Sequence, residues 1–347
     1  MKILLGLSGG VDSTYAALRL KAEGHTVEAA VLVMHEYTSV AEAEESARSL
    51  DIPLHVVDCR ARFDEVVKRS FAEEYLRGRT PNPCVVCNSE IKFIYLLEYA
   101  ESEGFDAIAT GHYASVVCLT DSLGSYYAVK RDRDVKKDQT YMLWRLPQRV
   151  LSRLVMPLSD MTKDEIREGS RESGLAAADR PDSQEICFLP NGGYAEFIED
   201  NFGKSEKGSF IDSDGNILGE HSGIIRYTVG QRKGLGISLG ARAFVTDIDP
   251  VANTVTLSTE DAYFSRVLIS GIVYSGMRRP GEGEELRLSV KLRYSAPPVM
   301  STVRFFSDRA EILTDTPVRA VTPGQSAVLY DGDILVAGGF IDKAYRG

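Results

Sequence analysis

Apolar residues along positions 1–203 form two kinds of pattern that alternate with each other. Short apolar runs that predict strands occur at 3–5, 26–34, 54–57, 105–109 and 126–129, and the run at 26–34 is nearly continuous, as expected for a parallel strand covered on both faces. Apolar residues at helical spacing occur at 11–24, 39–50, 63–75, 89–100 and 162–174. Two of these segments open with the spacing of a capping box, Ser39 with Glu42 and Thr162 with Glu165. The alternation predicts an α/β fold with a doubly wound parallel sheet.

Beyond about position 204 the pattern changes to short strands separated by turn residues, which predicts two smaller β domains. The expected strands are at 210–211, 217–218, 227–229, 286–292, 303–306 and 327–330. Asp212, Asp214 and Asn216 resemble the start of a calcium loop, but Ile217 holds the position of its glycine, so a hairpin turn is expected. We expect domains at 1–203, at 204–270 (a small β-rich domain) and at 271–347 (an antiparallel β-barrel).

Composition is that of an ordinary globular chain, with 44% hydrophobic and 26% charged residues among 347. No apolar run is long enough to span a bilayer, and the first residues lack a cleavable signal pattern. An odd number of cysteines, five, favours reduced thiols over a disulfide framework, so a cytoplasmic protein with no membrane partner is expected.

The net charge of −10 does not by itself favour nucleic-acid binding. Two segments, 226–242 and 287–304, nevertheless carry basic residues and no acidic ones. From charge alone, solvated strand faces are the simpler interpretation of both segments.

The stretch from Gly6 to Ser13 has the features of a phosphate-binding loop. Gly9 and Gly10 allow successive N–H groups to face one anion, Ser8 and Ser13 add hydroxyl donors, and a helix begins at Val11 with its positive end toward the same anion. The letters lack both the Lys-Ser/Thr of a Walker loop and the G-x-G-x-x-G of a dinucleotide fold. They resemble instead the pyrophosphate loop (PP-loop) of the ATP pyrophosphatases.

Three cysteines stand in informative contexts. Cys84 and Cys87 follow two prolines in a segment expected to be a loop up to Asn88, and Cys187 lies in a second expected loop. A Cys-x-x-Cys pair is compatible with zinc, redox exchange, an iron–sulfur cluster or packing alone, and spacing does not decide among them. Cys59 and Cys118 have apolar neighbours and are expected to be buried structural residues.

A series of separated motifs occurs in the same order as in a known protein family. After the loop come Thr-Pro-Asn-Pro-x-x-x-Cys-Asn, Thr-Gly-His-Tyr, Lys-Asp-Gln-x-Tyr, Ile-Cys-Phe, Tyr-Thr-Val-Gly-Gln-Arg-Lys-Gly-Leu-Gly and Tyr-Asp-Gly-Asp. Together they span nearly the whole chain and resemble the bacterial tRNA-specific 2-thiouridylases. The resemblance implies that positions 1–203 form a PP-loop ATP pyrophosphatase domain of the adenine nucleotide alpha hydrolase type and that the C-terminal barrel contacts tRNA.

Carried over residue by residue, the resemblance implies an ATP site and a tRNA site. The ATP site would comprise Gly6, Leu7, Ser8, Gly9, Gly10, Val11, Asp12, Ser13, Met34 and Gly111. The tRNA site would comprise Asn82, Pro83, Cys84, His112, Lys137, Asp138, Gln139, Arg293, Tyr294 and Gln325. This gives the acid-free segment around Arg293 a role in binding tRNA.

The implied reaction is ATP-dependent thiolation of a wobble uridine at C2, with Mg²⁺ accompanying the ATP. ATP would adenylate the C2 oxygen, and a persulfide on Cys187 would then attack C2. Cys87 would attack Cys187 to release the product as a disulfide forms, and both positions would need thiolate character. A cysteine desulfurase or a sulfur-carrier protein would supply the sulfur.

This chain departs from the family at Cys84, where many members have an Asp that has been viewed as a catalytic acid or base. With Cys84 present, an alternative is a [4Fe–4S] cluster on Cys84, Cys87 and Cys187, in which one iron stays open to bind sulfide. The segment after Met34 is also shorter than usual in the family.

Two other functions stay open on the sequence. One is a different PP-loop enzyme that adenylates a small molecule, although no glutaminase domain or ammonia source is visible in the chain. The other is a non-catalytic tRNA-binding module with a degenerate nucleotide site.

Overall fold

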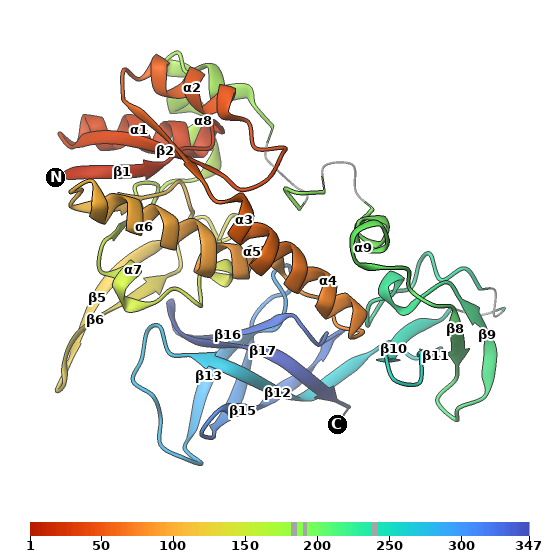
Figure 1. Ribbon diagram of the computed structural model, residues 1–347. Helices are drawn as coiled ribbons and strands as arrows, with labels where there is room; N and C mark the ends of the chain where they lie inside the picture. Colours follow the sequence, from red (N-terminus) through yellow and green to blue (C-terminus); the bar gives the residue numbers. More distant parts are fainter. Residues whose placement is uncertain (182–185, 190–192, 238–239, 241, 347) are drawn as a thin grey trace.

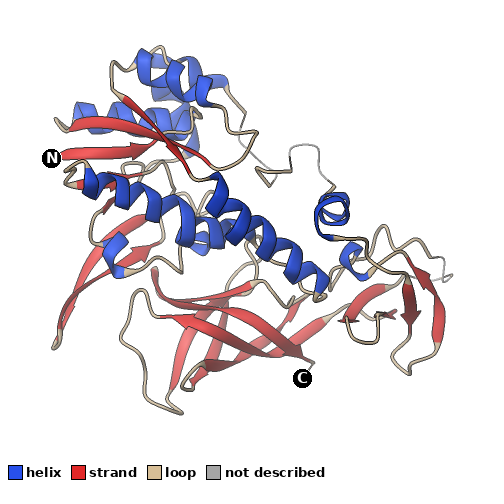
Figure 2. Ribbon diagram, in the orientation of Figure 1, coloured by secondary structure: helices blue, strands red, loops and turns tan. Residues whose placement is uncertain are grey.

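The computed structural model describes residues 1–181, 186–189, 193–237, 240 and 242–346. Figure 1 shows a mixed α/β region at the N-terminal end of the chain, a barrel beneath it at the C-terminal end, and a small β region to one side. Figure 2 shows that most of the helices gather in the first region, whereas strands dominate the other two. No helix of the described residues is long and apolar enough to cross a membrane.

The N-terminal sheet is parallel and has the strand order β3-β2-β1-β4-β7. Its strands are β1 (Lys2–Gly6), β2 (Thr26–Val33), β3 (Leu54–Asp58), β4 (Ala107–Ala109) and β7 (Leu154–Val155). The chain leaves β1 toward β2 on one side, while β4 pairs on the other, so the order reverses between β1 and β4. This confirms the predicted doubly wound sheet and marks its ligand-binding end.

Helices and one hairpin complete this region. They are α1 (Val11–Ala22), α2 (Val40–Ser49), α3 (Arg60–Phe63), η1 (Asp64–Lys68), α4 (Arg69–Leu76), α5 (Pro83–Cys87), η2 (Asn88–Lys92), α6 (Phe93–Ser102), β5 (Ser115–Asp121), β6 (Gly124–Lys130), η3 (Thr140–Met142), α7 (Gln148–Leu151), α8 (Lys163–Glu172), η4 (Ala176–Asp179) and α9 (Tyr194–Phe202). The capping box of Thr162 and Glu165 at the start of α8 is confirmed in both directions. At α2, the Ser39 hydroxyl accepts a hydrogen bond from the backbone N–H of Glu42.

The segment that carries Cys84 and Cys87 is a helix, so the prediction of a loop that ends before a helix at Ser89 was wrong. Helix α5 begins at Pro83, and the Asn82 side chain accepts a hydrogen bond from the backbone N–H of Cys84 at 3.1 Å. Proline is well suited to the first helical position, since it has no N–H to satisfy there, and Asn is a strong N-cap. The two π-helical segments, η1 and η2, follow α3 and α5 without a break.

The middle region is a small sheet of strand order β10-β11-β8-β9. Its elements are β8 (Gly208–Ile211), β9 (Ile217–His221), η5 (Ile224–Arg226), β10 (Phe244–Asp249) and β11 (Thr254–Ser258). The Asp212 carboxylate accepts the backbone N–H groups of Asp214 and Asn216, which confirms the expected hairpin turn. The strand expected at 227–229 is absent, because Gln231 turns back and its side chain accepts the N–H of Thr228.

The C-terminal region is an antiparallel barrel, as predicted. Its strand order is β12-β15-β14-β13-β16-β17, and pairing of β12 with β17 closes the ring. The strands are β12 (Tyr263–Val273), β13 (Glu285–Lys291), β14 (Val299–Phe305), β15 (Arg309–Arg319), β16 (Ser326–Asp331) and β17 (Ile334–Tyr345). The domain boundary expected between 270 and 271 falls inside β12.

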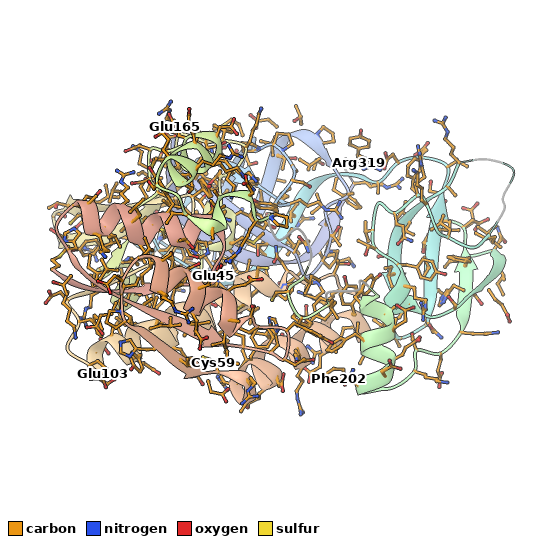
Figure 3. All side chains as sticks on the ribbon, turned by 90° about the horizontal axis from the view of Figure 1, so that it is seen from above. Glu45, Cys59, Glu103, Glu165, Phe202 and Arg319 are labelled. Carbon is orange, nitrogen blue, oxygen red and sulfur yellow. The ribbon has the colours of Figure 1, made fainter. Side chains whose placement is uncertain are left out.

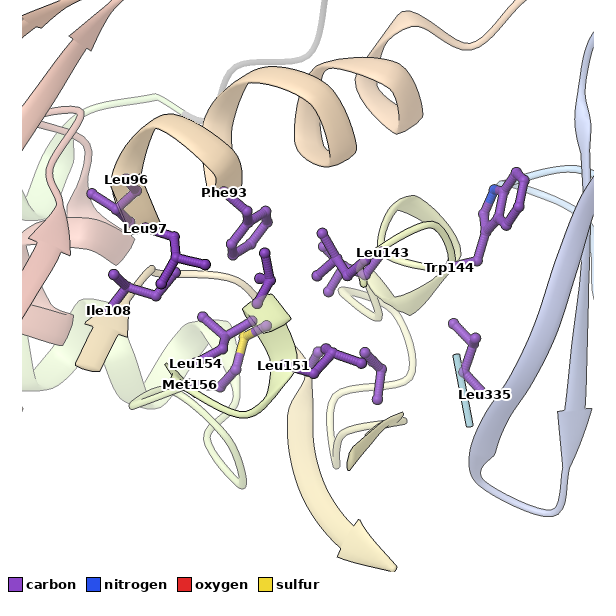
Figure 4. Close-up of a cluster of buried hydrophobic side chains, with 14 of the residues drawn as sticks. Phe93, Leu96, Leu97, Ile108, Leu143, Trp144, Leu151, Leu154, Met156 and Leu335 are labelled. Atoms are coloured by element: carbon purple, nitrogen blue, oxygen red, sulfur yellow. The ribbon is translucent and has the colours of Figure 1, made fainter. Parts of the chain in front are cut away.

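A shared core joins the barrel to the N-terminal region. Phe93 and Leu96 of α6 and Trp144 belong to one buried cluster with Leu335 of the barrel (Figure 4). Tyr330 of the barrel belongs to the same cluster. The indole N–H of Trp144 donates to the Ser326 hydroxyl at 2.9 Å. A Cβ on Gly338 would lie 2.6 Å from the Trp144 ring, so glycine lets β17 approach it. Figure 3, seen from above, shows the middle region set to one side, beyond Phe202 of α9.

We expect Trp144→Ala to lower the free energy of unfolding by about 3–5 kcal/mol, because it empties a buried site and leaves Ser326 without its donor. Leu123→Ala is the matched control, since Leu123 is 76% exposed. Urea denaturation followed by circular dichroism measures both variants, because Trp144 is the only tryptophan and its fluorescence is lost on substitution. A loss below about 1 kcal/mol would contradict the proposed bridging role.

Candidate active site

The loop from Gly6 to Ser13 connects β1 to α1 and is held in shape by its own side chains. The hydroxyls of Ser8 and Ser13 lie 3.1 Å apart, and the Ser13 hydroxyl also accepts the backbone N–H of Ser8 at 3.2 Å. Gly9 has a φ of +83°, and a Cβ there would lie 2.6 Å from the carbonyl carbon of Glu42 on α2. Only glycine fits this position, so the loop is pressed against α2 at the amino end of α1.

Asp12 is fixed from two directions. Lys163, at the first position of α8, donates to both carboxylate oxygens at 2.7 and 2.8 Å, and the Tyr113 hydroxyl donates to one of them at 2.6 Å. A Cβ on Gly169 would lie 2.5 Å from the hydroxyl oxygen of Tyr15, so α8 packs closely on α1. Sequence reasoning missed Lys163; its only signal was the capping box that starts α8.

The turn after β4 lies against the start of α1. A Cβ on Gly111 would lie 2.8 Å from the backbone nitrogen of Ser13, which explains the glycine. Next to it, the Thr110 hydroxyl and His112 Nδ1 are 2.8 Å apart, and the His112 ring packs against Phe93. Burial holds the pKa of His112 well below its ordinary value, and the nearby Lys92 lowers it further. His112 is therefore neutral at physiological pH.

These elements surround a cleft of about 470 Å³. The predicted site residues in its wall are Gly6, Leu7, Ser8, Asp12, Ser13, Met34, Gly111, His112, Gln139 and Cys187. Gly9, Gly10 and Val11 shape the loop without lining the cleft. Sequence reasoning missed other lining residues, among them Lys92, Thr110, His35 and Glu42. Lys92 follows Cys87 closely in the sequence, but nothing in the sequence indicated that its side chain would face the cleft.

The three candidate cysteines differ in exposure. Cys87 is buried on α5, where its thiol donates to the Met34 sulfur at 3.6 Å, whereas Cys84 and Cys187 are exposed. Burial raises the pKa of Cys87 to about 12, and surrounding protein atoms also raise the pKa values of Cys84 and Cys187. Lys92 is the cation that opposes the rise at all three. The expected thiolate character is therefore not built into the free thiols.

The other two cysteines, Cys59 and Cys118, differ in burial. Cys59 is buried as expected, and burial raises its pKa to about 12. Cys118 is exposed on β5, so the expectation that it is buried was wrong. Its neighbours in the sequence are apolar, but its own side chain faces outward from the β5–β6 hairpin.

The sequence left two metal groups open, a [4Fe–4S] cluster and Mg²⁺. Among the residues that the structure describes, no three His, Cys, Asp or Glu side chains gather closely enough to hold a metal ion. The thiols of Cys84, Cys87 and Cys187 nevertheless lie near enough to influence one another's pKa values, and a [4Fe–4S] cluster on them stays a prediction. Mg²⁺ makes smaller demands, since one or two carboxylates and phosphate oxygens suffice, and both Asp12 and Glu42 line the cleft.

The remaining predicted tRNA residues lie outside the cleft, around α5 and the barrel. Lys137, Asp138 and Cys84 lie close enough to Tyr294 to influence its pKa, which burial raises. The Gln325 side chain donates to the carbonyl of Thr80 at 2.7 Å, which ties the barrel to the segment before α5. Tyr294 and Cys84 are exposed, whereas Asp138 is buried and accepts hydrogen bonds from the backbone N–H and the hydroxyl of Thr140.

Three more of the predicted tRNA residues have structural contacts. Asn82 caps α5 and donates to the Met142 sulfur at 3.3 Å, and Pro83 is buried at the first helical position. Arg293 donates to the Thr322 hydroxyl at 2.7 Å, so part of its guanidinium braces the barrel. Their places near Tyr294 and Cys84 fit a binding surface, but the contacts themselves hold the fold together.

The fold and the cleft define the class of protein: a HUP-type nucleotide-binding domain with a pyrophosphate loop, joined to two β domains. Family models match all three regions: a tRNA methyl transferase HUP domain over residues 1–191, a tRNA methyl transferase PRC-barrel domain over 195–259, and an aminomethyltransferase beta-barrel domain over 266–341.

Comparison with related sequences narrows the class of protein to one family. The chain is 42% identical to the tRNA-specific 2-thiouridylase MnmA of Clostridioides difficile, covering 99% of this chain and 98% of that protein. It is 43% identical to the MnmA of Lachnoclostridium phytofermentans over 99% of each chain. The chain belongs to the tRNA-specific 2-thiouridylase family.

Among solved structures, a 4-thiouridine synthetase–RNA complex with bound ATP superposes with a TM-score of 0.37 and 23% identity. The match covers 57% of this chain and 50% of that one.

We expect iodoacetamide to label Cys84, Cys118 and Cys187 before Cys87 and Cys59. Alkylation requires the thiolate, and a pKa of about 12 leaves Cys87 almost fully protonated at pH 8, with about tenfold more thiolate for each pH unit gained. Peptide mass spectrometry at pH 7, 8 and 9 measures the order, and Cys59 is the matched buried control. Labelling of Cys87 as fast as Cys187 at pH 8 would contradict this assignment.

Proposed function

We propose that this protein uses ATP to replace the C2 oxygen of a tRNA wobble uridine with sulfur. The observation that carries the proposal is that Cys187 lines the same cleft as the phosphate loop. A thiol and a nucleotide-activating loop, far apart in the sequence, thus share one site. Membership of the 2-thiouridylase family supports the same reaction.

The loop would bind the phosphates of ATP through its backbone N–H groups, the hydroxyls of Ser8 and Ser13 and the positive end of α1. Met34 and Gly111 would contact the adenosine. Asp12 and Glu42 would hold Mg²⁺, which when bound neutralises part of the triphosphate charge. Asp12 would share its oxygens between that role and Lys163.

The uridine would reach the cleft past the exposed side chains of Tyr294 and Cys84. An exposed Tyr beside the entrance suits a base displaced from its stack. His112 and Gln139 line the cleft and would contact the base, and the neutral His112 has one nitrogen able to donate and one able to accept.

The chemistry would proceed in two steps. The C2 oxygen attacks the α-phosphate, the bond to the β-phosphate breaks, and pyrophosphate leaves. The terminal sulfur of a Cys187 persulfide then bonds to C2 while the C2–O bond breaks, and AMP leaves with the electron pair. A persulfide is a stronger acid than a thiol, so it supplies the anionic sulfur that the raised pKa of the free Cys187 thiol disfavours.

Release of the product would follow from attack by Cys87. Its thiolate bonds to the sulfur of Cys187, the bond to the transferred sulfur breaks, and 2-thiouridine leaves as a Cys87–Cys187 disulfide forms. A dithiol reductant must then reduce the disulfide, and a cysteine desulfurase or carrier must reload Cys187. These steps follow the persulfide route, and a [4Fe–4S] cluster on Cys84, Cys87 and Cys187 is the alternative source of sulfur. The role of Cys84 and a cytoplasmic location stay predictions.

We expect Cys187→Ser to abolish 2-thiouridine formation while pyrophosphate release continues, because the variant can adenylate tRNA but carries no persulfide. Cys118→Ser is the matched control, an exposed cysteine outside the cleft. The assay supplies tRNA, ATP, cysteine and a cysteine desulfurase, and nucleoside mass spectrometry reads the product.

Normal thiolation by the Cys187→Ser variant would overturn the sulfur route. AMP release that is independent of tRNA would point to a small-molecule substrate. Iron analysis of anaerobically purified protein tests the alternative: full activity without iron supports the persulfide route, and a stoichiometric iron requirement would contradict it.

A further inference from the structure

Lys92 is placed between the nucleotide cleft and the cysteines. It is the last residue of η2, the π-helical turn that continues α5 directly after Cys87. It lines the cleft together with Gly111, His112 and Cys187. A π-helical turn offsets the side chains that follow it, and such turns are frequent at functional sites.

Lys92 is half-buried. Among the residues that the structure describes, no carboxylate lies within ion-pair distance of it. Lys68 makes the contrast clear, because it is the last residue of the other π-helical turn, η1, yet it pairs with Asp64 at 2.9 Å and Glu36 at 3.2 Å. A partly desolvated charge is costly unless an anion compensates it, so a ligand is the natural source of the partner for Lys92.

The position of Lys92 along the cleft indicates which part of the ligand it meets. Its charge acts on Cys84, Cys87, Cys187 and His112, and electrostatic influence falls with distance. Two cations contact the loop, and both have acidic partners: Lys163 pairs with Asp12, and Arg180, which donates to the Gly9 carbonyl, pairs with Glu45. Lys92 therefore lies at the end of the cleft where sulfur is delivered, away from the site of the leaving pyrophosphate.

We propose that Lys92 is a catalytic residue of the sulfur-transfer step, whose ammonium contacts the phosphate that joins AMP to C2 of the activated uridine. This inference rests on the adenylation proposed above. As sulfur bonds to C2 and the C2–O bond breaks, the electron pair moves onto that phosphate oxygen, and Lys92 stabilises the negative charge while keeping its proton. AMP thus leaves as an anion without a proton donor, a role that the neutral thiol of Cys84 does not need to fill.

The experiment separates the two chemical steps. Enzyme and tRNA are mixed with ATP labelled at the α-phosphate, without a sulfur donor, and released pyrophosphate and labelled tRNA are measured. Sodium sulfide is then added without oxygen, and loss of AMP from the tRNA and formation of 2-thiouridine are followed in a single turnover. Hydrosulfide attacks C2 directly, so this step does not depend on the reactivity of the cysteines.

For Lys92→Met we expect pyrophosphate release within twofold of wild type, accumulation of AMP-labelled tRNA, and a sulfide-driven step slowed about 100-fold, the scale of losing one charge-stabilising donor. Lys92→Arg restores most of the rate because it keeps the charge. Lys68→Met, the same substitution at the matching position of η1, leaves both steps unchanged. Lys92→Gln replaces Lys92→Met if the latter fails to fold, as judged by circular dichroism.

Three outcomes would overturn the proposal. A wild-type rate of the sulfide step in Lys92→Met and Lys92→Gln removes Lys92 from the reaction, or restricts it to the thiols. Loss of pyrophosphate release assigns it to ATP. Equal loss in Lys92→Arg shows that shape rather than charge matters. Failure of the proposed function is distinguishable, because the wild type itself would then form no labelled tRNA.

Discussion

The close approach of the turn after β4 to the first residues of α1 is the contact on which the nucleotide cleft depends. Gly111 allows the two backbones to meet, and Tyr113 then reaches Asp12 from the same turn. Lys163 supplies the opposing charge from α8. Because β1 and β4 are neighbours at the point where the strand order reverses, these contacts fix one wall of the cleft at the carboxyl ends of the strands.

The opposite end of the cleft is formed by α5 and the π-helical turn η2 that follows it. Asn82 and Pro83 start α5 early, so Cys87 is turned inward onto Met34 and Cys84 outward. The π-helical turn then carries Lys92 back to the cleft. One short helical stretch therefore sets the exposure of two thiols and the place of one cation. Burial makes the inner thiol a weak acid.

On the barrel, the ion pairs in the structure differ from what the charge pattern along the sequence suggests. The segment 287–304 contains no acid in the sequence, yet Arg287 pairs with Asp315 at 2.6 Å and Arg304 lies 3.9 Å from Glu285. Both partners come from outside the segment, across the sheet. Two of the four basic residues of that segment are therefore paired with acids, whereas the ammonium of Lys291 lies 5.3 Å from the ring centroid of Tyr294.

The sequence by itself determined the doubly wound sheet, the barrel and the phosphate loop, because periodicity, glycine spacing and capping act over a few neighbouring positions. The role of Cys187 was implied by the resemblance to a family, and the structure places this residue in the wall of the cleft. Only the tertiary structure decided the start of α5, the outward position of Cys118 and the meeting of Lys163 with Asp12. It also decided that Lys92 lines the cleft and that no carboxylate of the described residues pairs with it. These features depend on contacts between residues far apart in the chain, where side-chain direction and burial are set by packing that no local pattern encodes.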